Sequence, residues 1–257
     1  MTTLHLDNWT VQAKALPRGS KRNADKVKGV TIHFSTGSGS DAGTPEGVVR
    51  ALKGHGSYNF LVGRRPPLVY MLIDPNIVAA HAGGKVKATG PGSDFPKARP
   101  PKPHQVADGK RYTRTPNGMS PNTNTIGVSF VAEYGFNKSG SRAKRDPHAV
   151  QSAWPHPKLG GPGWWEGFPP DQLEAGARLV AWLLIKYGMG NAPIDSVVFP
   201  HGEHPEATGI ANWKPDPGPG FPWSVFLRKV DQYRKGGVTA KFDKGGLLNP
   251  RILPRPN

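Results

Sequence analysis

Short apolar runs alternate along the chain with long polar stretches that are rich in glycine and proline. Five of these runs are apolar or β-branched and are bounded by charged, glycine or serine residues, as is typical of strands inside a sheet. The predicted strands cover residues 29–35, 58–62, 68–73, 126–132 and 197–199. Residues 63–67 separate the second strand from the third, which predicts a hairpin with a longer turn.

Helical periodicity follows the strands in three places. The clearest case is residues 171–187, where apolar side chains recur every three or four positions before Gly188. A second helix is predicted over 223–233. A third begins at Thr44, with a proline and an acidic residue next, and stops at Gly54. Strands that alternate with helices predict an α/β fold with a central mixed sheet flanked by helices.

The rest of the chain divides around this core. We expect an N-terminal extension at 1–26, one domain at 27–235, and a basic C-terminal tail without periodicity at 236–257. Two long insertions rich in proline and glycine, about 83–125 and 137–168, contain no periodic segment. Loops of such length inside a compact domain are usually functional or mobile.

Composition excludes several classes of protein. The 257 residues include no cysteine, which rules out a disulfide framework, a cysteine-bound metal and a thiol nucleophile. The longest purely apolar run, 179–185, is too short to span a membrane. The first 15 residues lack the apolar core of a signal peptide. We therefore expect a soluble protein that is made in the cytoplasm and has no leader of its own.

A large positive net charge limits the classes of partner that we expect. Lys and Arg number 34 against 18 Asp and Glu, a net charge of +16. Such a surface favours nucleic acid, anionic lipid or the anionic polymers of a bacterial wall. Basic residues concentrate at 97–114, 138–145 and 228–257, in the predicted loops and tail. Specific nucleic-acid binding rests on charge alone, because no nucleic-acid motif is visible.

Two histidines and one aspartate stand at rigid positions. His33 lies near the end of a predicted strand, His201 directly follows another, and Asp216 has a proline on each side. A lone histidine is more often a hydrogen-bonded core residue than a ligand. Together, however, two imidazoles and a carboxylate would leave one position of a tetrahedral zinc open for water, as in catalytic zinc sites.

Seven short motifs occur in a characteristic order. They are Thr31-Ile-His-Phe-Ser-Thr-Gly37, Ser57-Tyr-Asn-Phe-Leu61, Ala80-His-Ala-Gly83, Asn124-Thr-Ile-Gly-Val128, Gln172, His201-Gly202 and Lys214-Pro-Asp-Pro-Gly218. This ordered set resembles the zinc-dependent N-acetylmuramoyl-L-alanine amidases of type 2. These enzymes share a fold with amidase-type phage lysozymes and with peptidoglycan recognition proteins, so the resemblance implies that fold here.

The resemblance also implies residue roles. His33, His201 and Asp216 match the zinc ligands, and Lys214 matches a basic residue that stabilises the oxyanion. Tyr58 matches a tyrosine beside the metal site.

A substrate groove is implied as well. His81 matches the element that lines it, and Asn124 and Trp164 are further candidates for substrate binding. Aromatic rings often flank sugar grooves, but Trp164 could equally anchor its insertion to the domain.

The sequence departs from the family pattern at three points. Ser129 stands where many members have a glutamate, and Asn59 where a histidine often follows the aromatic residue. Glu133 has the same strand parity as Ser129 but lies roughly 13 Å further along an extended strand. His204 is a competing ligand candidate. The general base stays open between Tyr58, Glu133 and a metal-bound hydroxide assisted by His81.

The resemblance predicts hydrolysis of the amide bond between N-acetylmuramic acid and L-alanine in peptidoglycan. Basic insertions favour a polymeric wall over small recycled fragments, and hence an endolysin or a lysin carried in a phage particle. Residues 242–248 resemble a segment of some phage tail proteins, which adds a phage tail as a partner. The alternative is a non-catalytic peptidoglycan-binding module on the same fold, as the loss of the strand glutamate suggests.

Overall fold

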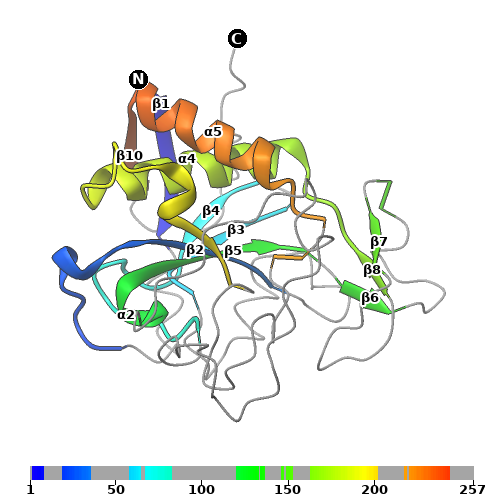
Figure 1. The fold of residues 1–257 in the computed structure, drawn as a ribbon, viewed down its shortest axis with the longest axis horizontal. Coiled ribbons are helices and arrows are strands. Elements are labelled where there is room, and N and C mark those ends of the chain that lie inside the picture. Colours follow the sequence, from blue (N-terminus) through cyan, green and yellow to red (C-terminus); the bar gives the residue numbers. More distant parts are fainter. Residues whose placement is uncertain are drawn as a thin grey trace, which may run out of the picture.

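A seven-stranded sheet forms the centre of the molecule (Figure 1). The computed structural model describes residues 2–8, 19–35, 58–64, 67–82, 120–132, 134–136, 146–147, 149–152, 163–201, 217–218 and 220–243. In spatial order the strands are β10 (Val238–Asp243), β1 (Thr2–Asn8), β4 (Val69–Met71), β3 (Phe60–Val62), β5 (Thr125–Val131), β2 (Gly29–Ser35) and β9 (Val198–Pro200). Neighbours are parallel except for the β3–β4 hairpin, which confirms the predicted α/β fold with a mixed sheet.

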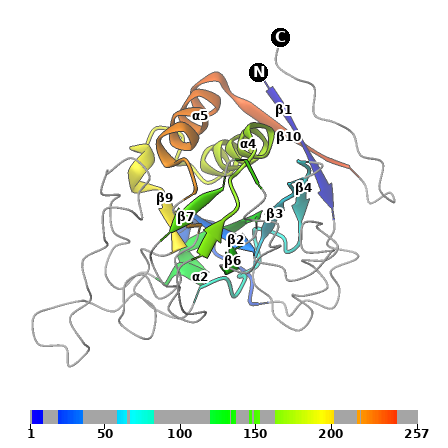
Figure 2. The ribbon, with the colours of Figure 1, turned by 90° about the vertical axis from the view of Figure 1, so that its right-hand side faces the viewer.

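Two helices, α4 (Pro170–Lys186) and α5 (Trp223–Gly236), pack against each other on one face of this sheet (Figures 1 and 2). Alternate residues of β2 and β5 join them in one apolar core, among them Ile32, Val128 and Phe130. The ring of Phe130 meets three other phenylalanine rings there. A Cβ at Gly176 of α4 would lie 2.2 Å from Phe130, so this glycine allows the helix to approach the sheet closely.

A second, smaller sheet follows β5. It consists of β6 (Tyr134–Phe136), β8 (Gly163–Trp165) and β7 (Val150–Ser152), paired antiparallel in that order. The short helix α2 (Pro121–Asn124) precedes β5, and the 3-10 turns η1 (Ala24–Lys26) and η3 (Ile194–Ser196) complete the set. The insertions, whose sequences contain no periodic segment, thus hold the short elements α2, β7 and β8. Elements of three or four residues are too short to show a period in the sequence.

Most of the elements predicted from the pattern are confirmed, since the five strands and the helices at 171–187 and 223–233 recur within a few residues of their predicted bounds. The helix predicted at Thr44–Gly54 lies outside the described residues. The prediction of a tail without periodicity is wrong over β10, which pairs with β1 at the edge of the main sheet. Residues 238–243 do alternate apolar and polar, but the run is short and carries charges. The division into extension, domain and tail stays a prediction.

No helix within the described part of the chain is long and apolar enough to cross a membrane.

Candidate functional site

Two of the candidate ligands meet at the ends of neighbouring strands. Ile32 of β2 pairs with Pro200 of β9 in parallel register, so that His33 and His201 follow side by side. Their ring centroids are 4.3 Å apart, and the residues are 0 % and 2 % exposed. The sequence placed both histidines at strand ends, and the order of strands in the sheet brings them together.

Two further aromatic side chains join this pair. His81, from the segment after β4, lies edge-on to His33, with 3.0 Å between His33 Nε2 and His81 Nδ1. The half-buried ring of Tyr58 lies 5.0 Å from that of His33, centroid to centroid. The histidine cluster, meaning His33, His81 and His201, therefore has Tyr58 beside it. It lies on the sheet face away from α4 and α5, because His33 alternates with the core residues Ile32 and Phe34.

The donor set of the cluster suits zinc. Imidazole nitrogen is a preferred zinc ligand, and the two buried rings of His33 and His201 converge. Within the described ranges, no group of three histidine, aspartate or glutamate side chains is arranged to hold a metal. A metal bound by His33 and His201 would need a further ligand from outside these ranges, and Asp216 lies outside the described residues. Lys214, Glu133 and His204 lie outside them too.

The residues that follow Asp216 are held in place. Pro217 and Gly218 are buried, and Gly218 has a φ of +89°. A Cβ at Gly218 would lie 2.4 Å from the ring of Trp165, which also packs against Phe34, next to His33. Glycine is thus required at 218 by both its conformation and the space. The insertion that carries Trp165 fixes the end of the Lys214–Gly218 motif.

Ser129 lies beside His33 on the adjacent strand. The two residues are register partners on β5 and β2, and Ser129 is fully buried. Its Oγ has no hydrogen-bond partner among the residues that the structure describes. Buried polar atoms are nearly always paired in native proteins, so this hydroxyl is one of the exceptions within the described part of the chain.

Two predicted substrate residues make their contacts with residues outside the cluster. Asn124 uses its side chain locally: Nδ2 donates to the carbonyl of Lys26, and Oδ1 accepts from the backbone N–H of Ser120. Trp164 is half-buried on β8, where it pairs with Gly135 of β6. Their roles in binding substrate, and that of His81, stay predictions.

The sequence did not predict a buried arginine that shares the carbonyl of Thr125 with His81. Arg22 donates to the side-chain carbonyl of Asn59 and to five backbone carbonyls, including that of Thr125 at 2.8 Å. Burial lowers the pKa of its guanidinium to about 10. Asn59 in turn accepts from the N–H of Gly127 and donates to carbonyls after β4. Nothing in the run Lys21-Arg22-Asn23 distinguishes the buried arginine from its exposed neighbours.

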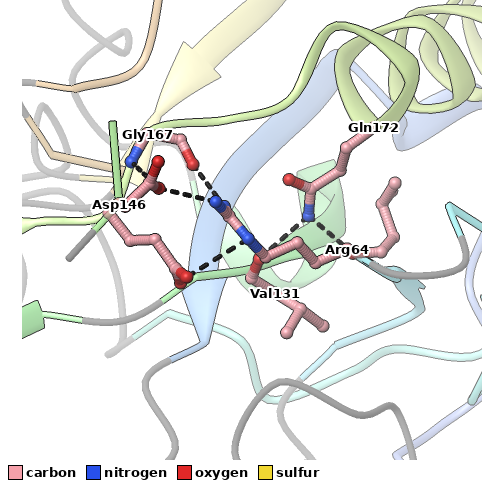
Figure 3. A network of polar contacts seen from close by, with 7 residues as sticks. Arg64, Val131, Asp146, Gly167 and Gln172 are labelled. Atoms are coloured by element: carbon pink, nitrogen blue, oxygen red, sulfur yellow. Dashed lines mark hydrogen bonds and ion pairs between the residues drawn. The ribbon is translucent and has the colours of Figure 1, made fainter. Parts of the chain in front are cut away.

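A second buried arginine joins the large sheet to the insertion (Figure 3). Arg64 pairs with Asp146 at 2.6 Å and with Glu166 at 3.2 Å, and it donates to the carbonyl of Gly167. Nearby, Gln172 Nε2 at the start of α4 donates to the last carbonyls of β3 and β5, those of Val62 and Val131. We call Arg64, Asp146 and Glu166 the Arg64 triad. It holds the segment that leads into α4 at the end of the sheet where His33 lies.

Comparison with known proteins gives one family. The model of a family described as N-acetylmuramoyl-L-alanine amidase (Amidase_2) matches residues 23–219, well over half of the chain. No curated protein sequence matches significantly.

Several solved structures resemble the fold at low sequence identity. The Staphylococcus aureus hydrolase AmiA, solved in complex with its ligand, has a TM-score of 0.45 and 11% identity, covering 93% of this chain and 87% of that one. AMPDH3 from Pseudomonas aeruginosa, in complex with anhydromuramic pentapeptide, has a TM-score of 0.47 and 18% sequence identity. The match covers 86% of this chain and 70% of that one. The N-acetylmuramoyl-L-alanine amidase LysC from Clostridium intestinale has a TM-score of 0.42 and 13% sequence identity. The match covers 90% of this chain and 98% of that one.

Proposed function

The chain belongs to the N-acetylmuramoyl-L-alanine amidase family, and we propose that it acts with a zinc ion held by His33, His201 and Asp216. Enzymes of this family hydrolyse the amide bond between N-acetylmuramic acid and L-alanine in peptidoglycan. Members of this family are typically zinc-dependent. The observation that carries the proposal is the pair of buried imidazoles, 4.3 Å apart at the ends of β2 and β9. Asp216 supplies the third ligand in this proposal, and the fixed Pro217 and Gly218 support that choice.

Zinc, when bound, supplies Lewis-acid polarisation of the scissile carbonyl and activation of water near neutral pH. The other roles belong to this chain's own residues. Lys214 donates a charged hydrogen bond to the oxygen that becomes negative, an effect worth about 3 kcal/mol. Tyr58 orients the substrate beside His33, supported by the contact of the two rings. Glu133 stays a candidate general base alongside Tyr58, because Ser129 cannot accept a proton at neutral pH.

Zinc content and product analysis test the proposal together. The purified protein is expected to hold one zinc ion and to release new N-terminal alanine from purified cell walls without new reducing sugar ends. His33→Ala and Asp216→Ala are expected to lose both zinc and activity. His204→Ala is the matched control and should retain both. Loss of zinc from His204→Ala but not from His201→Ala would overturn the ligand assignment.

We further propose that the substrate is the polymeric wall, as for an endolysin or a lysin carried in a phage particle. The net charge of +16 supports this, because it favours anionic wall polymers and peptidoglycan over small soluble fragments. Binding to purified walls should then weaken steeply with salt, and more so for walls that retain their anionic polymers. Equal binding to stripped and unstripped walls at every salt concentration would contradict it.

A further inference from the structure

We propose that His81 is a positioning residue, which fixes the tautomer of His33 so that the Nδ1 atom of His33 is the one that binds the metal. This inference rests on the proposed zinc centre. It starts from two hydrogen bonds, one between His33 and His81 and one between His81 and Thr125, which join β2, the segment after β4 and β5.

The first bond fixes the proton of His81. Its Nε2 lies 3.2 Å from the backbone carbonyl oxygen of Thr125, and a carbonyl only accepts. The Thr125 hydroxyl is 3.4 Å from the same nitrogen, but it donates to the carbonyl of Pro121 at 2.7 Å. The hydroxyl of Thr31, 2.6 Å from that of Thr125, is then the donor of that pair. Nε2 of His81 therefore carries the hydrogen.

The second bond passes this choice on to His33. A neutral imidazole has one N–H and one lone pair, so His81 Nδ1 is an acceptor. His33 Nε2, 3.0 Å away, must donate to it. The lone pair of His33 then resides on Nδ1, which becomes the nitrogen able to bind a cation. Metal-binding histidines generally have their tautomer set in this way by a bond from the other ring nitrogen.

The residues around His81 fix the position of its ring. His81 is 3 % exposed, and a Cβ at Gly127 would lie 2.6 Å from its Cγ, so glycine at 127 makes room for the ring. The carbonyl of Thr125 also accepts from Arg22 Nη1, at 2.8 Å. Arg22 in turn is fixed by the carbonyls around it. The orientation of His33 is thus tied to three segments of the main chain.

The tautomer can be measured without metal. Long-range ¹H–¹⁵N correlation spectra of the zinc-free full-length protein, labelled at histidine, distinguish Nε2–H from Nδ1–H rings. We expect Nε2–H for both His33 and His81. An Nδ1–H form of His33 would overturn the inference, whether or not the protein binds zinc.

Zinc affinity, measured by competition with a chelator, supplies the second readout. His81→Leu is expected to weaken zinc binding about 10–100-fold, the usual effect of losing an outer-shell partner. His81→Asn should recover most of this, because its Oδ1 takes the place of Nδ1 as acceptor. Equal weakening in both variants would mean that the side chain only fills space, and would overturn the inference.

Thr125→Val is the matched control. It removes the hydroxyl bonds of Thr125 and keeps the carbonyl that sets the tautomer, so it should lower stability and leave zinc affinity unchanged. A loss of zinc affinity as large as that of His81→Leu would again indicate a merely structural role. If the unaltered protein takes up no zinc, the proposed metal centre is wrong, while the spectra still decide the tautomer.

Discussion

The two faces of the central sheet are equally buried and chemically opposite. All seven residues of β2 are buried, and so are all seven of β5. Toward α4 and α5 these strands present Val30, Ile32, Phe34, Ile126, Val128 and Phe130. Toward the site they present residues that are mostly small or polar, namely Thr31, His33, Ser35, Thr125, Gly127, Ser129 and Val131.

Burial therefore means different things on the two faces. On the helix face it removes apolar surface from water and gains close packing, which is the main source of stability. On the site face a buried polar atom loses its bonds to water and is stable when it finds a partner, as His33 does with His81 and His81 with Thr125; Ser129 Oγ is an exception among the described residues. One strand can thus stabilise the fold and hold the chemistry, because its side chains alternate.

The largest expected effect is a loss of activity from the site face. His33→Ala should remove a proposed zinc ligand and lower kcat/KM at least a thousandfold, equivalent to about 4 kcal/mol of transition-state stabilisation. The unfolding free energy of the zinc-free protein should change much less. Amidase assays and urea denaturation in the presence of chelator measure the two effects. A variant that keeps half of its activity would contradict the proposed site.

The helix face should show the reverse. Phe130→Ala opens a cavity among Phe168, Phe221 and Phe226 and should lower the unfolding free energy by about 3–5 kcal/mol. Zinc bound per folded molecule should stay unchanged. Urea denaturation and zinc analysis test this, and a selective loss of zinc from the folded variant would show that the two faces are coupled.

The Arg64 triad tests what a charge requires in this interior. Arg64→Met removes the Arg64 guanidinium from the buried Asp146 and Glu166 and should cost about 3 kcal/mol or more. The triple variant with Asp146→Asn and Glu166→Gln should recover much of that loss. If the triple variant is no more stable than Arg64→Met, packing by the arginine stem matters more than its charge.

A smaller effect is expected at Ser129. Ser129→Ala removes a buried hydroxyl that has no partner among the described residues, so the unfolding free energy should stay within about 1 kcal/mol of wild type or rise. Val128→Ala, its neighbour on the helix face, is the matched control and should be clearly destabilising. Denaturation curves of the two variants compare the faces at adjacent positions.

The smallest expected effect is a change of stability with pH, from Tyr187 at the end of α4 and the nearby Arg22. Burial raises the pKa of Tyr187 to about 12, against a smaller opposing effect of the Arg22 cation. From pH 10 to 12 the unfolded chain loses this proton and the folded chain keeps it, so this group makes stability fall as pH rises. The pKa of Arg22, lowered by burial to about 10, acts with the opposite sign in the same range.

Tyr187→Phe removes the falling contribution. It also removes the charge interaction by which Tyr187 raises the pKa of Arg22, and a lower Arg22 pKa strengthens the rising contribution. The stability of the variant relative to wild type should therefore increase between pH 10 and 12, and ultraviolet titration should lose one tyrosine with a midpoint near pH 12. A variant whose titration curve lacks a tyrosine of ordinary pKa would contradict the assignment.

Much of the fold follows from local patterns. The strand at β2 and the helix α4 were predicted within a residue of their bounds, because β-branched runs and helical periodicity are properties of neighbouring residues. The pair β1 and β10 was missed, since both strands carry polar and charged residues and each pairs with a partner more than 200 residues away. The resemblance identified His33 and His201, but it did not reveal that His81 bonds to His33.

The sequence by itself determined which segments form strands and helices, and it placed two imidazoles at strand ends. Only the tertiary structure decided which buried polar groups are paired. His33 with His81, Arg22 with Thr125 and Arg64 with Asp146 are 48, 103 and 82 positions apart. Such pairs depend on the order of strands in the sheet, because a buried polar atom must find its partner wherever the packed chain brings one.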